Sequence, residues 1–506
     1  MSRRSPVAMT AAQFREAGHR LVDRLADLIE GIPSGPVTHG EGPAEIRRAL
    51  SLEGPLPEEG TDGTQLLLDT AEQLFAHSCF NAHPRFFGYI TAPPAPVGVL
   101  GDFLASAANP NVGLFQLAPA ATEIEVQAVR WIAEMIGFPA TCGGLMVSGG
   151  NMANLIAFFA ARTAGAGHDI RSGGLAGGSR RLQVYASQET HTWIQKASDL
   201  SGLGTDSIRW IETDDRLRMR VDALRRAIEE DRARGDLPLL VVGTGGSVST
   251  GTVDPLPEIA AVCREHGIWF HVDGAYGGFA AALPDADPAL RAIADADSIA
   301  VDPHKWLYAP LEAGCVLVRD PAKLREAFSF HPPYFEMGIE QTNFVEYGTQ
   351  NSRVFRALKV WLLLRQAGAK GYRRMIAEDI ALSRRLAETV SRTPELELLT
   401  QELSITTFRY VPERLRARVG DEDAERELNE LNQGLVQSLQ RKGEVFLSNA
   451  VIRGRYALRA CIVNFHTEEG DVDAVPAIVL REGRAAEAEL AAAAGKRTGE
   501  AGTATR

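Results

Sequence analysis

The chain has 506 residues, of which 45% are hydrophobic and 23% charged, a composition ordinary for a soluble globular enzyme. Its net charge of −12 and the lack of any Lys/Arg run argue against general nucleic-acid binding. The five cysteines show no metal-ligand spacing, so we expect neither disulfides nor a metal site. The amino-terminal segment is interrupted by charges, and no apolar run approaches the roughly 20 residues that span a bilayer. We therefore expect a soluble cytoplasmic protein.

Two amphipathic helices are predicted at the amino-terminal end. Apolar residues recur at helical spacing from Thr10 to Ile32 and again from Thr64 to Phe80, with charged residues on the opposite faces. The stretch between them, to about Gly63, is rich in Pro and Gly and is predicted to be an extended linker. Because no partner surface lies nearby in the sequence, we expect residues 1–85 to form an arm that packs on another domain or subunit.

An aromatic segment, His-Pro-Arg-Phe-Phe-Gly-Tyr, follows from His83 to Tyr89. Taken alone, each of Phe86, Phe87 and Tyr89 is best explained as a core residue. The neighbouring prolines interrupt regular structure, so a pocket wall is the alternative. The segment from Pro119 to Ile136 then predicts a helix with its charged residues on one side.

From Pro139 onwards, short buried strands alternate with helices, which is typical of an α/β domain with a mostly parallel central sheet and helices on both faces. The predicted strands are 144–147, 182–186, 207–211, 239–243, 269–272, 298–301 and 315–318. The predicted helices are 152–163, 191–200, 221–234, 256–266, 353–367 and 372–393.

A smaller α+β domain is predicted after these helices. Its strands are 396–399, 405–410, 444–448 and 456–461, and they surround a helix at 425–441. We therefore expect a large α/β domain over 86–385, a small domain over 386–483, and a flexible tail over 484–506, which is rich in Ala, Glu and Gly.

Lys305 is the candidate nucleophile. It follows the buried strand 298–301, at the edge of an open α/β sheet where ligands bind. Between His304 and Trp306 its surroundings are partly apolar, which favours the neutral amine that attacks an aldehyde. No other lysine of the chain combines a buried strand with aromatic neighbours. An isolated lysine at a strand end is more often a surface residue, so other stretches must decide.

Two further stretches supply an acid and an imidazole. Asp273 ends a buried strand, where its carboxylate can hold a pyridinium N–H; its alternative role is to cap the next turn. His191 opens a helix, where its ring can stack on a flat aromatic ligand; its alternative role is purely structural.

A third stretch leads from a strand into a helix. Ser148, Gly149, Gly150 and Asn151 combine backbone amides, a hydroxyl and a helix amino terminus, which together form a seat for phosphate. Such turns are common when taken alone. The pattern is neither GxGxxG nor GxxxxGK[ST], so neither a dinucleotide nor a nucleotide triphosphate is favoured.

A phosphate seat, a stacking imidazole, a ring-nitrogen carboxylate and a reactive amine together meet the needs of pyridoxal 5′-phosphate (PLP). On these residues the chain resembles the group II PLP-dependent amino acid decarboxylases, of the aromatic-L-amino-acid decarboxylase and glutamate decarboxylase type. The resemblance is strongest at 148–150, 271–275 and 302–306. It implies the fold-type I, PLP-dependent transferase-like architecture and a homodimer with active sites at the subunit interface, on which the arm packs.

The resemblance also implies roles for single positions. Lys305 matches the lysine that binds the cofactor aldehyde, Asp273 the partner of the ring nitrogen, Ala275 the small residue under the ring, and His191 the stacking residue. The positions implied to bind phosphate or to support the lysine are Ser148, Gly149, Gly150, Asn151, Asp302 and His304. The chain departs from the family at Asn151, where Ser or Thr is usual, and at Gly246-Ser-Val-Ser249, where a Gly-Thr-Thr run is usual.

A loop is predicted over 328–342, around Pro332-Pro333-Tyr334. The resemblance implies that this is the catalytic loop, which acts at the neighbouring subunit's site, and that Tyr334 returns a proton to the substrate Cα after carbon dioxide leaves. A packing tyrosine is the alternative. Arg353 and Ser352 resemble the family's cross-subunit contacts to phosphate and substrate.

The expected reaction is decarboxylation of an L-amino acid to its amine and carbon dioxide. An aromatic substrate of the tyrosine, DOPA, phenylalanine or tryptophan type is favoured by Phe86 and Tyr89 as substrate contacts and by overall likeness to that branch. An acidic substrate such as glutamate stays open, with Arg85 as a partner for its side chain. The same cofactor could also serve an aldehyde synthase, which adds oxidative deamination. A non-catalytic scaffold that keeps the fold is the alternative from another class.

Overall fold

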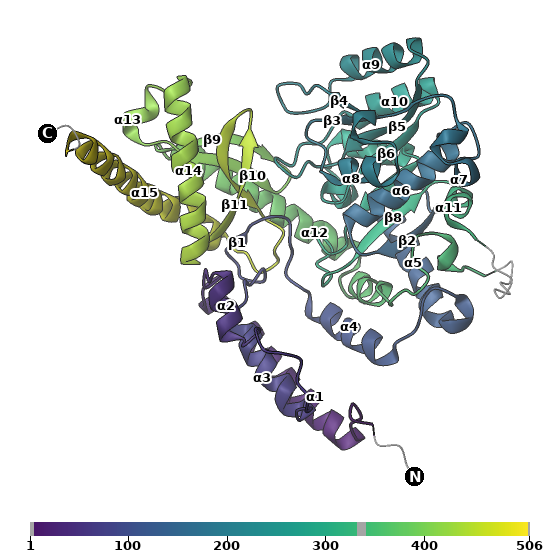
Figure 1. The fold of residues 1–506 in the computed structure, drawn as a ribbon, viewed down its shortest axis with the longest axis horizontal. Helices are drawn as coiled ribbons and strands as arrows, with labels where there is room; N and C mark the ends of the chain where they lie inside the picture. The colour runs from purple at the N-terminus through teal and green to yellow at the C-terminus, as the bar shows by residue number, and fades with distance from the viewer. Residues whose placement is uncertain (1–4, 331–340, 504–506) are drawn as a thin grey trace.

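The structure, a computed structural model, describes residues 5–330 and 341–503. Figure 1 shows a large α/β domain, a smaller carboxyl-terminal domain beside it, and an amino-terminal helical arm that extends away from both. Across the described ranges, no helix is long and apolar enough to cross a bilayer.

The large domain is built on the strands β2 (Gly143–Val147), β3 (Leu182–Ser187), β4 (Ile208–Ile211), β5 (Leu237–Thr244), β6 (Trp269–Asp273), β7 (Ser298–Val301) and β8 (Gly314–Val318). They form a seven-stranded sheet in the order β2-β8-β7-β6-β5-β3-β4. Pairing is parallel from β7 to β4, and β8 is antiparallel to both β2 and β7. The predicted mostly parallel sheet is therefore confirmed.

Helices cover both faces of this sheet. On one face, α6 (Gly150–Gly165) and α8 (Trp193–Leu200) pack their apolar residues against β3 and β5. On the other face lie α5 (Pro119–Ile136), α10 (Leu256–His266) and α12 (Ala357–Arg392). The remaining α-helices of the large domain are α4 (Pro96–Ala108), α7 (Ile170–Gly173), α9 (Val221–Ala233) and α11 (Pro321–Phe328).

Two of these helices differ from the prediction. Helix α4 was not predicted, because its sequence is apolar nearly all round and shows no helical period. Helix α12 covers both helices predicted at 353–367 and 372–393, with a single non-helical residue, Gly368, at the junction. Because α12 runs through residue 386, the predicted domain boundary falls inside a helix that belongs to both domains.

The small domain has a second sheet, made of β1 (Phe86–Phe87), β9 (Leu396–Glu402), β10 (Ile405–Tyr410), β11 (Phe446–Ile452) and β12 (Arg455–Cys461). Its order is β1-β11-β12-β10-β9. The predicted start of the large domain at residue 86 is therefore wrong, because Phe86 and Phe87 pair in parallel with β11 of the small domain. A strand of two residues is too short to show any periodicity.

Helices complete the small domain: α13 (Glu413–Arg416), α14 (Glu422–Lys442) and α15 (Glu469–Thr503). The flexible tail predicted from residue 484 lies in α15 as far as Thr503. Its first turns are held by ion pairs from Arg484 to Glu395 and from Glu487 to Arg414. The correction has a simple cause: these contacts are charged, so the lack of large apolar residues did not reveal them.

The amino-terminal arm consists of α1 (Ala11–Gly31) and α3 (Gly63–Ala76), which pack on each other, and the short helix α2 (Pro43–Ala49) in the predicted linker. Pro43 at the first helical position and a capping Glu45 start α2. Phe14 of α1 stacks on Phe103 of α4, with 6.3 Å between ring centroids, and both side chains stay exposed. The arm therefore joins α4 in one exposed apolar surface.

Candidate active site at the carboxyl edge of the central sheet

A hollow of about 630 Å³, part of it open to solvent, lies at the carboxyl edge of the central sheet. Thr244 and Asp273 are the last residues of β5 and β6, and Asp302 follows β7 directly, so three neighbouring parallel strands deliver polar groups to one place. The predicted residues that line the hollow are Gly150, Asn151, His191, Asp273, Ala275, Asp302, His304 and Lys305.

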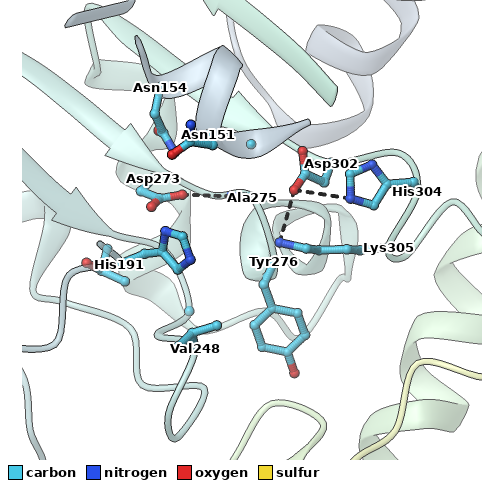
Figure 2. Close-up of a pocket in the computed structure, with 13 residues that line it drawn as sticks. Asn151, Asn154, His191, Val248, Asp273, Ala275, Tyr276, Asp302, His304 and Lys305 are labelled. Carbon is cyan, nitrogen blue, oxygen red and sulfur yellow. Dashed lines mark hydrogen bonds and ion pairs between the residues drawn. The ribbon is translucent and has the colours of Figure 1, made fainter. Parts of the chain in front are cut away.

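Lys305 points into this hollow and is paired with an acid. Its Nζ lies 3.0 Å from Oδ2 of Asp302, and Nε2 of His304 lies 3.6 Å from the same oxygen (Figure 2). The surroundings of Lys305 are therefore less apolar than the sequence predicts, because a buried carboxylate directly faces its amine. Oδ1 of Asp302 is buried and has no hydrogen-bond partner among the described residues, which leaves one acceptor for a ligand.

The predicted phosphate seat lies at the amino terminus of α6. Gly149 has φ 152° and ψ 179°, a backbone conformation that favours glycine. Gly150 leaves no room for a side chain, because a Cβ there would lie 2.8 Å from Oδ2 of Asp302 and 2.9 Å from Cβ of Ala275. Asn151 is exposed at the hollow. The first backbone N–H groups of the helix and the close glycines together suit an anion.

Asp273 is buried and already holds two donors. Its Oδ2 accepts a hydrogen bond of 2.8 Å from the indole N–H of Trp193, and its Oδ1 accepts one of 3.2 Å from the backbone N–H of Ala275. These bonds fix the carboxylate and stabilise its charge, while spare lone pairs remain for a ligand. Trp193 was missed in the sequence, where its only signal is its position two residues after His191.

His191 lies on the loop before α8, near Asp273 and Val248 at the hollow (Figure 2). The backbone N–H of Trp193 donates to its Nδ1 at 3.3 Å, so in the neutral ring Nε2 carries the proton. The ring stays partly exposed, yet desolvation by the surrounding protein lowers the pKa of His191 below its usual value. A neutral ring of this kind suits stacking better than charge pairing.

Asn154 is a lining residue that sequence reasoning missed, and a chain of buried hydrogen bonds leads to it. Oγ of Ser298 accepts from the indole N–H of Trp269 at 2.8 Å. Nδ1 of His271 lies 2.8 Å from the same Oγ, and its Nε2 lies 2.6 Å from Oδ1 of Asn154. Burial lowers the pKa of His271 to about 4, so the ring is neutral and carries one proton.

The direction of this chain follows from its last member. The amide oxygen of Asn154 can only accept, so the single proton of the neutral His271 ring is on Nε2 and is donated to that oxygen. Nδ1 of His271 then accepts from the hydroxyl of Ser298, whose oxygen accepts from the indole N–H of Trp269. The amide NH₂ group of Asn154 is therefore the part left for the hollow, three residues beyond Asn151 on the same face of α6.

Several predicted residues are not brought to the hollow. Arg353 is buried beneath β2, where its guanidinium donates to the carbonyls of Val112 and Met146 and to Glu125, which is also buried. The guanidinium makes its hydrogen bonds within its own subunit, and its Nε is buried without a partner among the described residues, so the predicted cross-subunit phosphate contact is not supported. Apart from the family resemblance, nothing in the sequence indicates that Arg353 pairs with Glu125, because 228 residues separate them.

The predicted substrate residues also lie elsewhere in this chain. Phe86 is buried and stacks on Phe446 at 5.1 Å, in the small-domain sheet. Tyr89 is 62% exposed beside the same ring, and Ser352 is exposed at the start of the segment that leads into α12. Ser148 and Gly149 precede the lining residues of α6. Tyr334 lies outside the described residues.

The residues present fit PLP. The free acceptor on Asp302, the glycines that bring the chain close at the start of α6, and a fixed carboxylate at Asp273 occur around one hollow. The hollow offers donors for a phosphate, an acid for a ring nitrogen and an amine for an aldehyde. Within residues 5–330 and 341–503, no cluster of three or more His, Cys, Asp or Glu side chains could hold a metal ion.

Comparisons with known proteins agree with this fit. Residues 43–411 match the family model described as the pyridoxal-dependent decarboxylase conserved domain. The chain is 34% identical to an aromatic-L-amino-acid decarboxylase from Bacillus atrophaeus (91% of this chain, 93% of that protein) and 31% identical to a phenylacetaldehyde synthase from Petunia hybrida (89% and 90%). A crystal structure of Oryza sativa TDC with PLP and tryptamine superposes with a TM-score of 0.87 at 27% identity (95% and 99%).

Proposed function

Because this chain belongs to the pyridoxal-dependent decarboxylase family, and is thus a fold-type I carboxy-lyase that uses PLP to decarboxylate an amino acid, we propose that its substrate is an aromatic L-amino acid. The observation that carries the proposal is the match along nearly the whole chain to an aromatic-L-amino-acid decarboxylase. The superposed Oryza sativa structure contains tryptamine, an aromatic amine, which supports the same substrate class.

The site residues are assigned roles as follows. Lys305 binds the cofactor aldehyde through Nζ, and Asp302, 3.0 Å away, holds that amine in place. Asp273 holds the ring N–H, and the donors on its own oxygens fix the orientation of the carboxylate. His191 covers the ring and excludes water from one face. When bound, PLP supplies a sink for the electrons of the bond to the substrate carboxylate.

An acidic substrate is less well supported by the geometry. Arg85, the candidate partner for a second carboxylate, already pairs with Asp471, with 3.2 Å between Nε and Oδ1. Lys305 is the one Lys or Arg among the described residues that line the hollow, and it is assigned to the cofactor. A substrate with an acidic side chain would therefore find no further Lys or Arg among the described residues that line the hollow.

A panel of L-amino acids tests the substrate class. With PLP-loaded protein, we expect carbon dioxide release from tyrosine, DOPA, phenylalanine or tryptophan at a kcat/KM at least ~100-fold above that for glutamate, because the hollow offers no spare cation for the glutamate side chain. Lys305→Ala is the control and should lose the visible band of the bound cofactor together with activity. A preference for glutamate or aspartate would overturn the aromatic assignment.

An aldehyde synthase is the second candidate, because the chain is 31% identical to a phenylacetaldehyde synthase. The two reactions differ in product: a decarboxylase yields the amine, whereas an aldehyde synthase consumes oxygen and yields aldehyde and peroxide. Measuring amine, aldehyde and oxygen consumption in one reaction separates them. We expect amine as the main product; stoichiometric oxygen consumption would favour the synthase.

We also propose that the chain is a homodimer joined through the arm. Exposed apolar side chains gather on α1, α3 and α4, including Phe14, Leu66, Leu100, Phe103 and Leu104. A continuous apolar surface of this kind is unusual on a monomer and suits a second copy. Light scattering after gel filtration should give twice the chain mass, and Phe103→Asp should shift it towards the monomer. Leu200→Asp, at an exposed leucine of α8 outside this surface, is the control and should leave the mass unchanged.

A further inference from the structure

The segment that follows Lys305 is buried and tied to one acid. Trp306 and Tyr308 are at most 1% exposed, although each has a polar group at its tip. The indole N–H of Trp306 donates to Oδ2 of Asp379 at 3.0 Å, and the hydroxyl of Tyr308 donates to the same oxygen at 2.7 Å. One carboxylate oxygen on α12 thus holds the side chains on both sides of Leu307, directly after the lysine.

Asp379 is the acceptor on which several donors depend. Burial raises the pKa of Asp379 to about 7, while Tyr308, Trp306 and the nearby backbone N–H of Asn464, from the small domain, favour its charged form. An indole N–H and a backbone amide can only donate, and the Tyr308 hydroxyl donates to Asp379 as well, because burial keeps its pKa well above the usual value and the hydroxyl keeps its proton. Asp379 itself is only 3% exposed. Its loss would leave buried donors unpaired, which is costly.

The backbone of the same segment adopts a conformation that needs support from its surroundings. Tyr308 has φ 53°, in the left-handed region that a bulky residue adopts only when its surroundings hold it. Its backbone N–H donates to the carbonyl of Lys305 at 3.0 Å, so this turn also fixes the main chain of the lysine. Trp306 stacks on Tyr276, with 4.7 Å between centroids, and Tyr276 lines the hollow.

We propose that Asp379 is a positioning residue for Lys305: by holding Trp306 and Tyr308, it keeps Nζ where it can attack the cofactor aldehyde. Nζ bonds to the aldehyde carbon, and one water leaves. Asp379 touches neither cofactor nor substrate. The inference rests on the family's cofactor and not on the proposed aromatic substrate, so it stands even if the substrate assignment fails.

Asp379→Asn is the informative change, because it keeps the shape of the side chain but replaces one carboxylate oxygen, an acceptor, with an NH₂ group, a donor. If the amide oxygen faces Trp306 and Tyr308, the NH₂ group meets the N–H of Asn464, donor against donor; the reverse orientation leaves the two side chains unpaired. Either way the turn after Lys305 loosens. Misplacement of a reacting group by about 1 Å can cost on the order of 100-fold in rate.

The test compares two ligands on apoenzyme made from the full chain. PLP joins Lys305 covalently and gives a visible absorbance band, whereas pyridoxamine phosphate has no aldehyde and binds only non-covalently. For Asp379→Asn we expect band formation with PLP to slow on the order of tenfold or more, with affinity for pyridoxamine phosphate within about twofold of wild type. Tyr308→Phe, which removes one donor, should show a smaller change in the same direction.

Asp231→Asn is the matched control, because Asp231 is equally buried and also accepts a tyrosine hydroxyl, from Tyr185 at 2.7 Å, but lies on α9 away from the hollow. It should lower thermal stability without changing the binding of either ligand. Equal weakening of both ligands by Asp379→Asn would show a merely structural role, and an unchanged rate of band formation would show no role; both overturn the proposal. If Asp379→Asn does not fold, Tyr308→Phe and Trp306→Phe decide by the same two readouts.

Discussion

Replacing Gly150 by alanine tests the close packing at the phosphate seat. An added Cβ would lie 2.8 Å from Oδ2 of Asp302 and 2.9 Å from Cβ of Ala275. Both neighbours are buried and neither is the far end of a flexible side chain, since Ala275 has no further atoms and Asp302 is held by Lys305. The start of α6 or the segment after β7 must therefore move.

The expected change in the free energy of unfolding is the sum of two opposing contributions. Forcing one methyl group into a packed site costs about 1–3 kcal/mol. Alanine in place of glycine in a helix returns about 0.5–1 kcal/mol. We therefore expect Gly150→Ala to lower the free energy of unfolding by a net ~0–2.5 kcal/mol. Because the carboxylate beside Lys305 is displaced, we also expect it to weaken PLP binding about tenfold or more.

The measurements are urea unfolding of the apoprotein and titration with PLP. Gly434→Ala is the matched control: Gly434 lies within α14, and a Cβ there meets nothing within 4 Å. It should stabilise the protein by about 0.5–1 kcal/mol and leave PLP affinity unchanged. If Gly150→Ala behaved like Gly434→Ala in both assays, the seat would have room for a side chain and the packing argument would be refuted.

Three further predictions concern other parts of the chain. Arg353→Met should lower the free energy of unfolding, measured in urea, by about 3–5 kcal/mol, because Glu125 is left buried without its ion-pair partner. The control is Arg130→Met, which removes an exposed ion pair with Glu134 and should change the free energy of unfolding by less than ~0.5 kcal/mol. The pKa of His271 falls from 6.5 to about 4 on folding, so between these values the unfolded chain binds one more proton; stability should fall by about 3 kcal/mol as pH drops through this window, and His271→Gln should remove that dependence. Tyr334→Phe should keep carbon dioxide release but divert product to aldehyde; an unchanged amine yield would exclude it as the proton donor.

Most of the fold could be predicted because its elements carry strong local patterns. Helix α5 and strand β7 begin and end where the apolar period and the flanking prolines predict, and β10 does the same. Elements without a period were missed: α4 is apolar nearly all round, and β1 has two residues. The segment after residue 484 was misjudged because ion pairs, rather than apolar contacts, hold the start of that helix extension.

The residues of the candidate site also divide into those that the sequence predicts and those that it does not. Residues that line the hollow could be predicted, because Asp273 ends a buried strand, Lys305 and the start of α6 each follow one, and strand ends meet at one sheet edge. Arg353 could not be placed correctly, because its partner Glu125 is a residue of another helix with no local relation to it. A family resemblance indicates which residue of this chain corresponds to a functional residue of the family. The contacts that this residue makes depend on how this chain packs.

The residues that support the site share one property that explains why sequence patterns do not show them. Trp193 lies 80 positions from Asp273, His271 lies 117 from Asn154, and Asp379 lies 71 from Tyr308. In a parallel α/β sheet, successive strand–helix units bring their ends to one edge, so a donor in one unit fixes an acceptor in another. A change in one of these partners is therefore expected to act at the shared edge, where the cofactor is predicted to bind. For this reason ligand-dependent measurements should separate these residues from equally buried ones, such as Asp231, that bridge units away from the edge.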